Sequence, residues 1–175
     1  MEAHKRAPGQ IILDLDATDD PVHGHQKGRF VHGDYDCYCY LPLSGFCCCH
    51  LLAARLRHSD IDASAGSVEE MARIVAQLRA CWPRVRVLLR ADCGLAREAL
   101  MAWCEANRVD YLFRLAHNSR LEGEIDAGLA EFAVESHATG RPARRFPDSM
   151  WSEDPRFQCL ALETMTDRPV WGRSF

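Results

Sequence analysis

Apolar runs and polar turns alternate along the first third of the chain, as in a sheet built from consecutive strands. Gln10 to Asp16 is a short apolar run with β-branched residues, which predicts a buried strand. Residues 19–28 are polar and predict a loop. Tyr35 to Leu43 alternates and is rich in aromatic residues, and Phe46 to Leu56 is again apolar, so each predicts one more strand. Because the connections are short, these three strands should form an antiparallel meander.

A helical period begins after the small-residue stretch that precedes Ser67. Ser67 and Glu70 have the spacing of a capping box, which predicts a helix that starts here. Pro83 predicts its end. The expected inner face follows a 3.6-residue period and consists of Val68, Met71, Val75, Leu78 and Trp82.

Strands and helices then alternate. We expect a strand at Val85–Ala91, an amphipathic helix at Leu95–Asn107, a strand at Tyr111–Leu115 and an acidic helix at Arg120–His137. The inner face of the helix at Leu95–Asn107 should hold Leu95, Ala99, Leu100, Trp103 and Cys104. The order β-β-β-α-β-α-β-α predicts an α/β fold, a mixed five-stranded sheet with helices on its faces. In such a sheet the first and fourth strands can lie side by side.

The pattern also divides the chain. We expect a disordered segment at 1–9, one domain at 10–146 and a poorly ordered tail at 147–175, where periodicity is lost. A length of 175 residues is enough for one domain with a sizeable core. No apolar run approaches the ~20 residues that cross a bilayer, and the start lacks a signal-peptide core, so we expect a cytoplasmic protein without membrane contact. The nine scattered cysteines then predict free thiols.

Charge narrows the classes of function. The formal net charge of −4 argues against a free-standing nucleic-acid binder with a strongly basic face. It leaves open an enzyme that reaches phosphate groups through metal ions. Nearly all cations are arginines, since the only lysines are Lys5 and Lys27.

Carboxylates stand at the ends of two predicted strands. Asp14 and Asp16 close the first run, and Asp92 follows the strand that ends at Ala91. Aspartate is depleted in strands and costly to desolvate, so two such endings indicate carboxylates that converge at a sheet edge on a hard divalent cation. The alternative is that each aspartate opens a turn or caps a helix.

Four motifs in order carry a family resemblance. They are Leu13-Asp-Leu-Asp-Ala-Thr-Asp-Asp-Pro-Val-His-Gly-His-Gln, Tyr35-Asp-Cys-Tyr-Cys-Tyr-Leu-Pro-Leu, Asp60-Ile-Asp-Ala-Ser-Ala-Gly and Val87-Leu-Leu-Arg-Ala-Asp-Cys-Gly-Leu-Ala-Arg-Glu. Residues 10–146 thereby resemble the catalytic domain of a bacterial DDE transposase of the insertion sequence (IS) thirteen-eighty group. The resemblance implies an RNase H-like fold in which Asp16 and Asp92 are catalytic residues and ligands of Mg²⁺ or Mn²⁺. It also implies transposon-end DNA as partner, and metal-dependent cleavage and strand transfer of that DNA.

The chain departs from that pattern in its acids. By the resemblance, the third acid is a glutamate on a later helix that this chain does not reach, and Cys93 stands where relatives commonly have serine. Among the later glutamates, four fall on a predicted helix with no matching motif: Glu122, Glu124, Glu131 and Glu135. Glu163 lies in the tail, which no longer resembles the family. We therefore expect a truncated catalytic core, inactive alone, that binds metal weakly and associates with bacterial DNA in the cytoplasm.

Other readings stay open. Asp14-Leu-Asp16-Ala-Thr18 also spells the Asp-x-Asp-x-Thr of a haloacid-dehalogenase-like phosphatase with Asp14 as nucleophile, although no lysine follows Lys27 to hold the phosphoryl group. A second reading is a non-catalytic fragment that pairs with intact transposase.

Side chains outside the acids are also open to two interpretations. The run Cys47-Cys48-Cys49-His50 suggests a metal-binding module, but a matching second cysteine pair is absent. His23 and His25 lie on the loop after Asp16, and Arg90 and Arg97 flank Asp92. In one interpretation the histidines contact DNA phosphate or the substrate water and the arginines contact the DNA backbone. In the other, all four side chains are solvated at the surface.

Overall fold

The computed structural model describes residues 7–33, 36–114 and 133–141, together with the strand segments 143–145, 162–165 and 168–171. The chain divides into two units, Met1–Phe113 and Arg114–Phe175.

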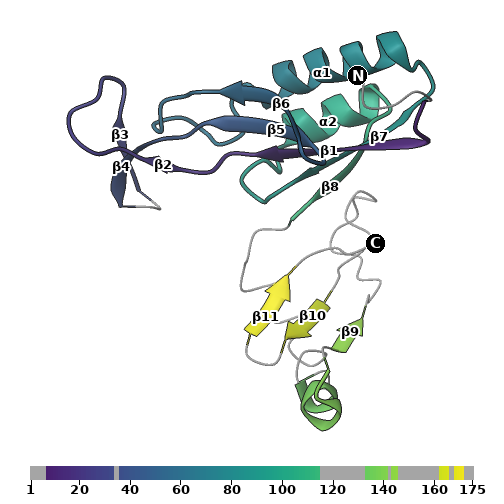
Figure 1. Ribbon diagram of the computed structural model, residues 1–175. Helices are drawn as coiled ribbons and strands as arrows, with labels where there is room; N and C mark the ends of the chain where they lie inside the picture. Colours follow the sequence, from purple (N-terminus) through teal and green to yellow (C-terminus); the bar gives the residue numbers. More distant parts are fainter. Residues whose placement is uncertain are drawn as a thin grey trace. The chain divides into compact units, whose positions relative to one another are not determined.

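The first unit is built on a mixed five-stranded sheet in the order β6-β5-β1-β7-β8 (Figure 1). Its strands are β1 (Gln10–Asp16), β5 (Leu43–Cys47), β6 (His50–Arg55), β7 (Arg86–Ala91) and β8 (Asp110–Phe113). β1 runs antiparallel to β5 and parallel to β7, and β7 runs parallel to β8. The predicted mixed α/β sheet is confirmed, and so is the pairing of its first and fourth strands.

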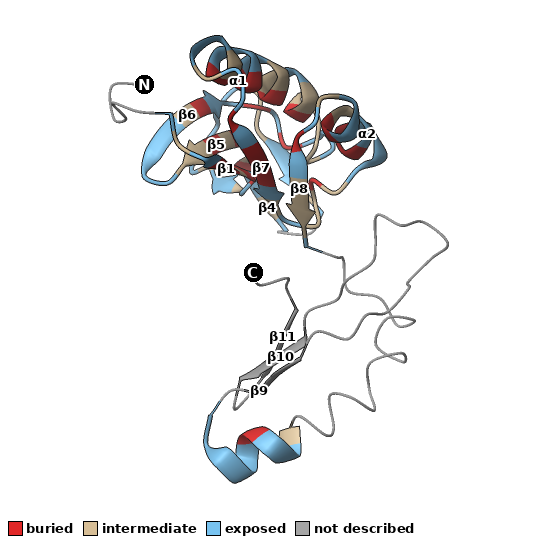
Figure 2. Ribbon diagram, turned by 90° about the vertical axis from the view of Figure 1, so that its right-hand side faces the viewer, coloured by how far each residue is buried: buried red, intermediate tan, exposed pale blue. Residues whose placement is uncertain are grey.

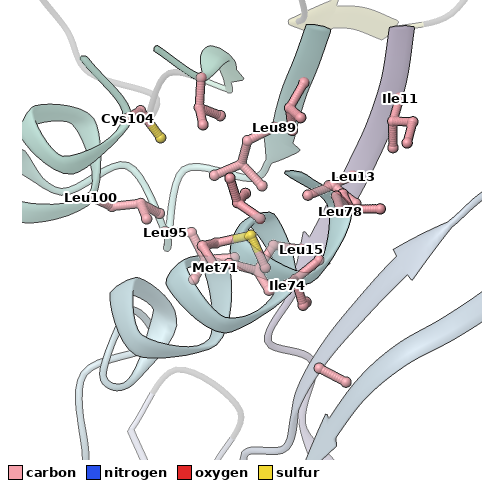
Figure 3. Close-up of a cluster of buried hydrophobic side chains, with 14 of the residues drawn as sticks. Ile11, Leu13, Leu15, Met71, Ile74, Leu78, Leu89, Leu95, Leu100 and Cys104 are labelled. Carbon is pink, nitrogen blue, oxygen red and sulfur yellow. The ribbon is translucent and has the colours of Figure 1, made fainter. Parts of the chain in front are cut away.

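Two helices, α1 (Ser67–Cys81) and α2 (Glu98–Ala106), cover one face of this sheet. Alternate residues of β1 are buried in the core. β7 buries three consecutive residues, of which Val87 and Leu89 belong to the core cluster. The side chains in Figure 3 show this layer, in which strand residues such as Leu13 and Leu89 pack with Met71 of α1 and Leu100 of α2. Figure 2 shows the buried stripe of each helix. Within the described residues of this unit both helices lie on this one face, whereas the sequence predicted helices on both.

The second and third predicted strands are wrong in their bounds. Part of Tyr35–Leu43 forms β4 (Cys37–Tyr40), which pairs with β2 (Asp20–Pro21) and β3 (Phe30–His32) in a separate sheet of order β2-β4-β3. The continuous strand predicted at Phe46–Leu56 is instead the hairpin of β5 and β6. Its strands pair up to Cys47 and His50, so Cys48 and Cys49 form the turn.

That turn escaped the sequence pattern for a chemical reason. Two-residue hairpin turns require a positive φ, which Gly and Asn adopt most easily. Cys48 adopts this conformation with φ 52°. Because Cys47, Cys48 and Cys49 are all apolar, the sequence pattern predicts that the strand continues through them. A turn made of cysteines therefore carries no turn signal.

The start of α1 also differs from its prediction. The N-cap is Gly66 with φ 76°, and no side chain caps the helix, so the Ser67–Glu70 capping box is wrong. Ser67 is instead the first helical residue and is buried. A β-carbon at position 66 would lie 2.9 Å from Nη1 of Arg55, so both the backbone conformation and the available space favour glycine there. The end predicted by Pro83 agrees with the last helical residue, Cys81.

The helix predicted at Leu95–Asn107 is shorter than expected. α2 begins at Glu98, and its buried residues are Leu100, Met101 and Cys104. Ala99, which the sequence placed inside, is exposed. Leu95 is fully buried, but it lies in the turn before the helix.

The second unit contains a helical segment at 133–139 and the strands β9 (Ala143–Arg145), β10 (Leu162–Met165) and β11 (Arg168–Trp171), in the order β11-β10-β9. Most of the helix predicted at Arg120–His137 lies outside the described residues. β10 and β11 fall in the stretch where the sequence shows no periodicity. No helix in the described part of the chain is long and apolar enough to cross a membrane.

Candidate metal centre

Asp16 and Asp92 reach the same edge of the sheet. Asp16 is the last residue of β1, and Asp92 directly follows the last residue of β7. The last register pair of these parallel strands is Leu15 with Ala91, so the next residue on each strand is one of the two aspartates. Residues 76 positions apart in the sequence thus end neighbouring strands on the same level. This juxtaposition is the one expected from the strand order.

Asp16 presents its carboxylate at an exposed position. Its Oδ2 accepts a hydrogen bond from the Thr18 hydroxyl at 2.5 Å. On the other side of β1, the antiparallel register places Ser44 of β5 opposite Asp16. Oxygen-bearing side chains therefore lie on each side of this strand end.

Asp92 is held by the turn that leads into α2. Its Oδ1 accepts a hydrogen bond from the backbone N–H of Leu95 at 3.3 Å. A β-carbon at Gly94 would lie 3.3 Å from the same Oδ1 and 3.4 Å from the β-carbon of Ala63. Glycine at position 94 therefore leaves room for the carboxylate, which gives a physical reason for the Asp-Cys-Gly sequence.

The carboxylate of Asp14 is bound by Arg90. Nε of Arg90 donates to Oδ1 at 2.6 Å and Nη2 donates to Oδ2 at 2.9 Å, a bidentate ion pair between directly paired residues of β1 and β7. Residues two apart on a strand share a face, so Asp14, Arg90 and Asp16 lie on the face away from the helices. The sequence analysis missed this pair. Its only signal is that Asp14 and Arg90 each precede a candidate acid by two residues.

A second ion pair fixes the loop around Asp92. Asp62 accepts hydrogen bonds from the backbone N–H and the hydroxyl of Ser64 at 2.8 and 2.6 Å, and from Nη2 of Arg97 at 3.1 Å. The hydrogen bonds from Ser64, and then Arg97, lower the pKa of Asp62 against the opposing effect of burial. Arg97 also donates to the carbonyl of Cys93 at 3.4 Å. Both arginines that flank Asp92 are therefore paired with carboxylates.

The histidines of the loop after β1 have separate surroundings. Nδ1 of His25 lies 2.9 Å from Nη2 of Arg29, whose guanidinium also stacks on the ring of Tyr38 at 4.3 Å and donates to the carbonyl of Gly24. His23 is exposed. Neither histidine joins a group of potential metal ligands in the described part of the chain.

The two acids suit Mg²⁺ in kind, because hard divalent cations prefer carboxylate oxygens. Their number is low: the described residues contain no group of three or more His, Cys, Asp or Glu side chains that could hold an ion. The described run Cys47-Cys48-Cys49-His50 forms no such group either. Of the candidate glutamates, Glu135 is described and belongs to the second unit. The side chains of Glu122, Glu124, Glu131 and Glu163 lie outside the described residues.

The family model described as "Transposase DDE domain group 1" matches residues 1–157. Among curated proteins no match was found.

Proposed function

Because the chain belongs to the transposase DDE domain group 1 family, we propose that Asp16 and Asp92 correspond to the first two acids of the metal centre that cleaves DNA in intact transposases of this family. The observation that carries this proposal is the parallel register of β1 and β7, which ends both strands in a carboxylate at one edge. The family match covers most of the chain and supports transposition-related DNA cleavage as the general activity. The catalytic segment in this proposal is 10–146, with an RNase H-like fold of the insertion sequence (IS) thirteen-eighty group.

The chemistry follows from what carboxylates can hold. Mg²⁺ or Mn²⁺ bound there would supply Lewis-acid activation of the attacking oxygen and charge stabilisation at the leaving oxygen of a phosphodiester. The task of Asp16 and Asp92 is to hold the ion at a fixed place relative to the DNA. Thr18 and the N–H of Leu95 orient the two carboxylates through their hydrogen bonds. The partner in this proposal is transposon-end DNA.

We further propose that two acids alone bind one metal ion weakly and do not cleave DNA. The described residues gather no third ligand at this edge, and two-metal cleavage requires more carboxylate oxygens than two aspartates supply. Association with intact transposase is the role left to such a protein.

Two observations favour this proposal over the phosphatase reading. Both oxygens of Asp14 are engaged by Arg90, so the carboxylate is poorly placed to attack a phosphoryl group. The element that follows β1 in the main sheet is a hairpin of strands, whereas the phosphatase reading expects a helix.

The test is Mn²⁺ binding to the full chain by calorimetry, combined with nicking of supercoiled DNA. Asp16→Asn and Asp92→Asn should each abolish binding, while the exposed Asp20→Asn should leave it unchanged. Nicking should stay at background in all variants. Unchanged binding in Asp16→Asn and Asp92→Asn would overturn the proposed centre. Hydrolysis of p-nitrophenyl phosphate that is lost in Asp14→Asn would replace it with the phosphatase.

A further inference from the structure

A third carboxylate, that of Asp14, lies on the same strand face as Asp16, and one guanidinium binds both of its oxygens. Both oxygens of Asp14 accept hydrogen bonds from Arg90, at 2.6 and 2.9 Å. The Arg90 and Asp14 side chains are 46% and 36% exposed, so the pair is open to water. Exposed ion pairs contribute little to folding stability, typically about 0–1 kcal/mol. A contribution to folding stability is therefore a weak explanation for the presence of this bidentate ion pair beside the candidate centre.

We propose that Arg90 withholds Asp14 from the metal ion and so limits the centre to two carboxylates. Asp14 and Arg90 are in this sense positioning residues, and the inference rests on the proposed function of Asp16 and Asp92. The cation keeps the third carboxylate pointed across the sheet toward β7, one strand repeat before the edge where Asp16 and Asp92 end.

The geometry makes Asp14 a competent ligand once it is released. Two residues along a strand span about 6.6 Å, a distance that rotation of one aspartate side chain can partly close. The antiparallel register places the apolar Phe46 on the other side of Asp14, so the paired neighbour that offers a cation is Arg90. Removing the guanidinium would thus leave an extra negative charge on the metal-binding face.

The two members of the pair therefore have opposite expected effects. Loss of Arg90 frees an anion, which attracts a divalent cation. Loss of the Asp14 charge frees a cation, which pairs with Asp16 or repels the metal. A pair with a purely structural role would behave differently, because breaking it from either side would disturb the strand register in the same way.

The experiment measures Mn²⁺ affinity of the full chain by calorimetry for Arg90→Gln, Asp14→Asn and the double variant, with folding checked by circular dichroism. Arg90→Gln should bind Mn²⁺ about tenfold more tightly, the effect of one extra charge near a dication in water, and Asp14→Asn should bind it several-fold more weakly. The double variant should return close to the parent. Arg90→Lys keeps the cation and should stay close to the parent.

A matched control comes from the neighbouring ion pair on the same sheet. Arg86 donates to Asp110 at 3.1 Å between β7 and β8, with side chains 72% and 57% exposed. Arg86→Gln and Asp110→Asn should leave Mn²⁺ affinity unchanged, because this pair lies toward the opposite end of β7.

The outcomes separate the two proposals. If Asp16→Asn abolishes binding but Arg90→Gln leaves it unchanged or weakens it, the withholding role is overturned and the metal centre stands. Equal shifts of the same sign in Arg90→Gln and Asp14→Asn overturn the role in the same way. If Asp16→Asn and Asp92→Asn do not affect binding, both proposals fail. If Arg90→Gln does not fold, Asp14→Asn and Arg90→Lys still test the inference. Mn²⁺ binding by Asp14→Asn that is as tight as in the parent would contradict it.

Discussion

Arg57 is a buried cation that holds together the segment before α1, and its replacement should destabilise the first unit. The residue is only 6% exposed. Its Nε donates to the carbonyl of Leu41 at 2.8 Å, and its Nη1 donates to the carbonyls of Ala63 and Ala65 at 3.0 and 2.5 Å. The same segment carries Asp62, so Arg57 also supports the loop that is paired with Arg97.

The expected cost of Arg57→Met is a loss of about 3 kcal/mol in the free energy of unfolding. Each hydrogen bond from a charged donor contributes roughly 1.5–3 kcal/mol, and three carbonyls lose their donor. In the parent protein, part of the stabilisation by these hydrogen bonds is offset, because burial disfavours the charged guanidinium and lowers the pKa of Arg57. In addition, Nη2 of Arg57 is buried without a hydrogen-bond partner in the part of the chain that the structure describes.

Urea unfolding of the full chain, followed by far-ultraviolet circular dichroism, measures this cost. The exposed Arg84→Met is the matched control and should change the free energy of unfolding by less than about 0.5 kcal/mol. A loss below about 1 kcal/mol for Arg57→Met, or a loss equal to that of the control, would refute the reasoning that these carbonyls depend on Arg57.

Three further predictions concern the core, the pH dependence of stability and the thiols. Leu89 has no exposed area, so Leu89→Ala should lower the free energy of unfolding in urea by about 3–5 kcal/mol. Leu56 is 65% exposed, and Leu56→Ala should lower it by less than about 1 kcal/mol. Similar losses for the two variants would contradict the core shown in Figure 3. The folded state lowers the pKa of Asp62, so its contribution to stability is present above about pH 4 and is lost as the pH falls through the lower folded-state value. Asp62→Asn should therefore flatten the stability curve in that range, and parallel curves would show otherwise. Burial raises the pKa of Cys104 to about 12, so a thiol reagent at neutral pH should label the exposed Cys48 in the native protein and leave Cys104 unlabelled until urea is added, as mass spectrometry of peptides can check.

Sequence alone predicted the central elements of the fold, because their burial imposes a regular pattern. β1 and β7 appear in the sequence as short apolar runs because their residues are buried, and α1 buries a stripe at helical spacing, so each element carries a hydrophobic signal. The hairpin of β5 and β6 was missed because Cys48 forms its turn without the usual turn residues. The sheet of β2, β3 and β4 was missed because its strands have two to four residues, too few for a periodic pattern.

Only those features of the candidate centre that follow from the order of the strands could be predicted from the sequence. Adjacent parallel strands that both end in aspartate place Asp16 and Asp92 at one edge, and the order of elements was enough to infer this. The pairing of Asp14 with Arg90 depends on the register of β1 against β7, and a shift of one residue in that register would abolish the ion pair. Single-sequence periodicity fixes the face of a strand but leaves its register against a distant strand undetermined.

The parallel pairing of β1 with β7 has a kinetic consequence. Contacts such as Asp14 with Arg90 join positions 76 residues apart, whereas the hairpin of β5 and β6 joins near neighbours. Long-range pairing requires a large loop to close before any contact is gained, so it slows folding. Local hairpin and helical structure can therefore form first, and the edge that carries both acids arises only when the distant halves of the sheet meet. In a nascent chain the proposed metal centre would therefore form late, after β7 has been synthesised and has docked.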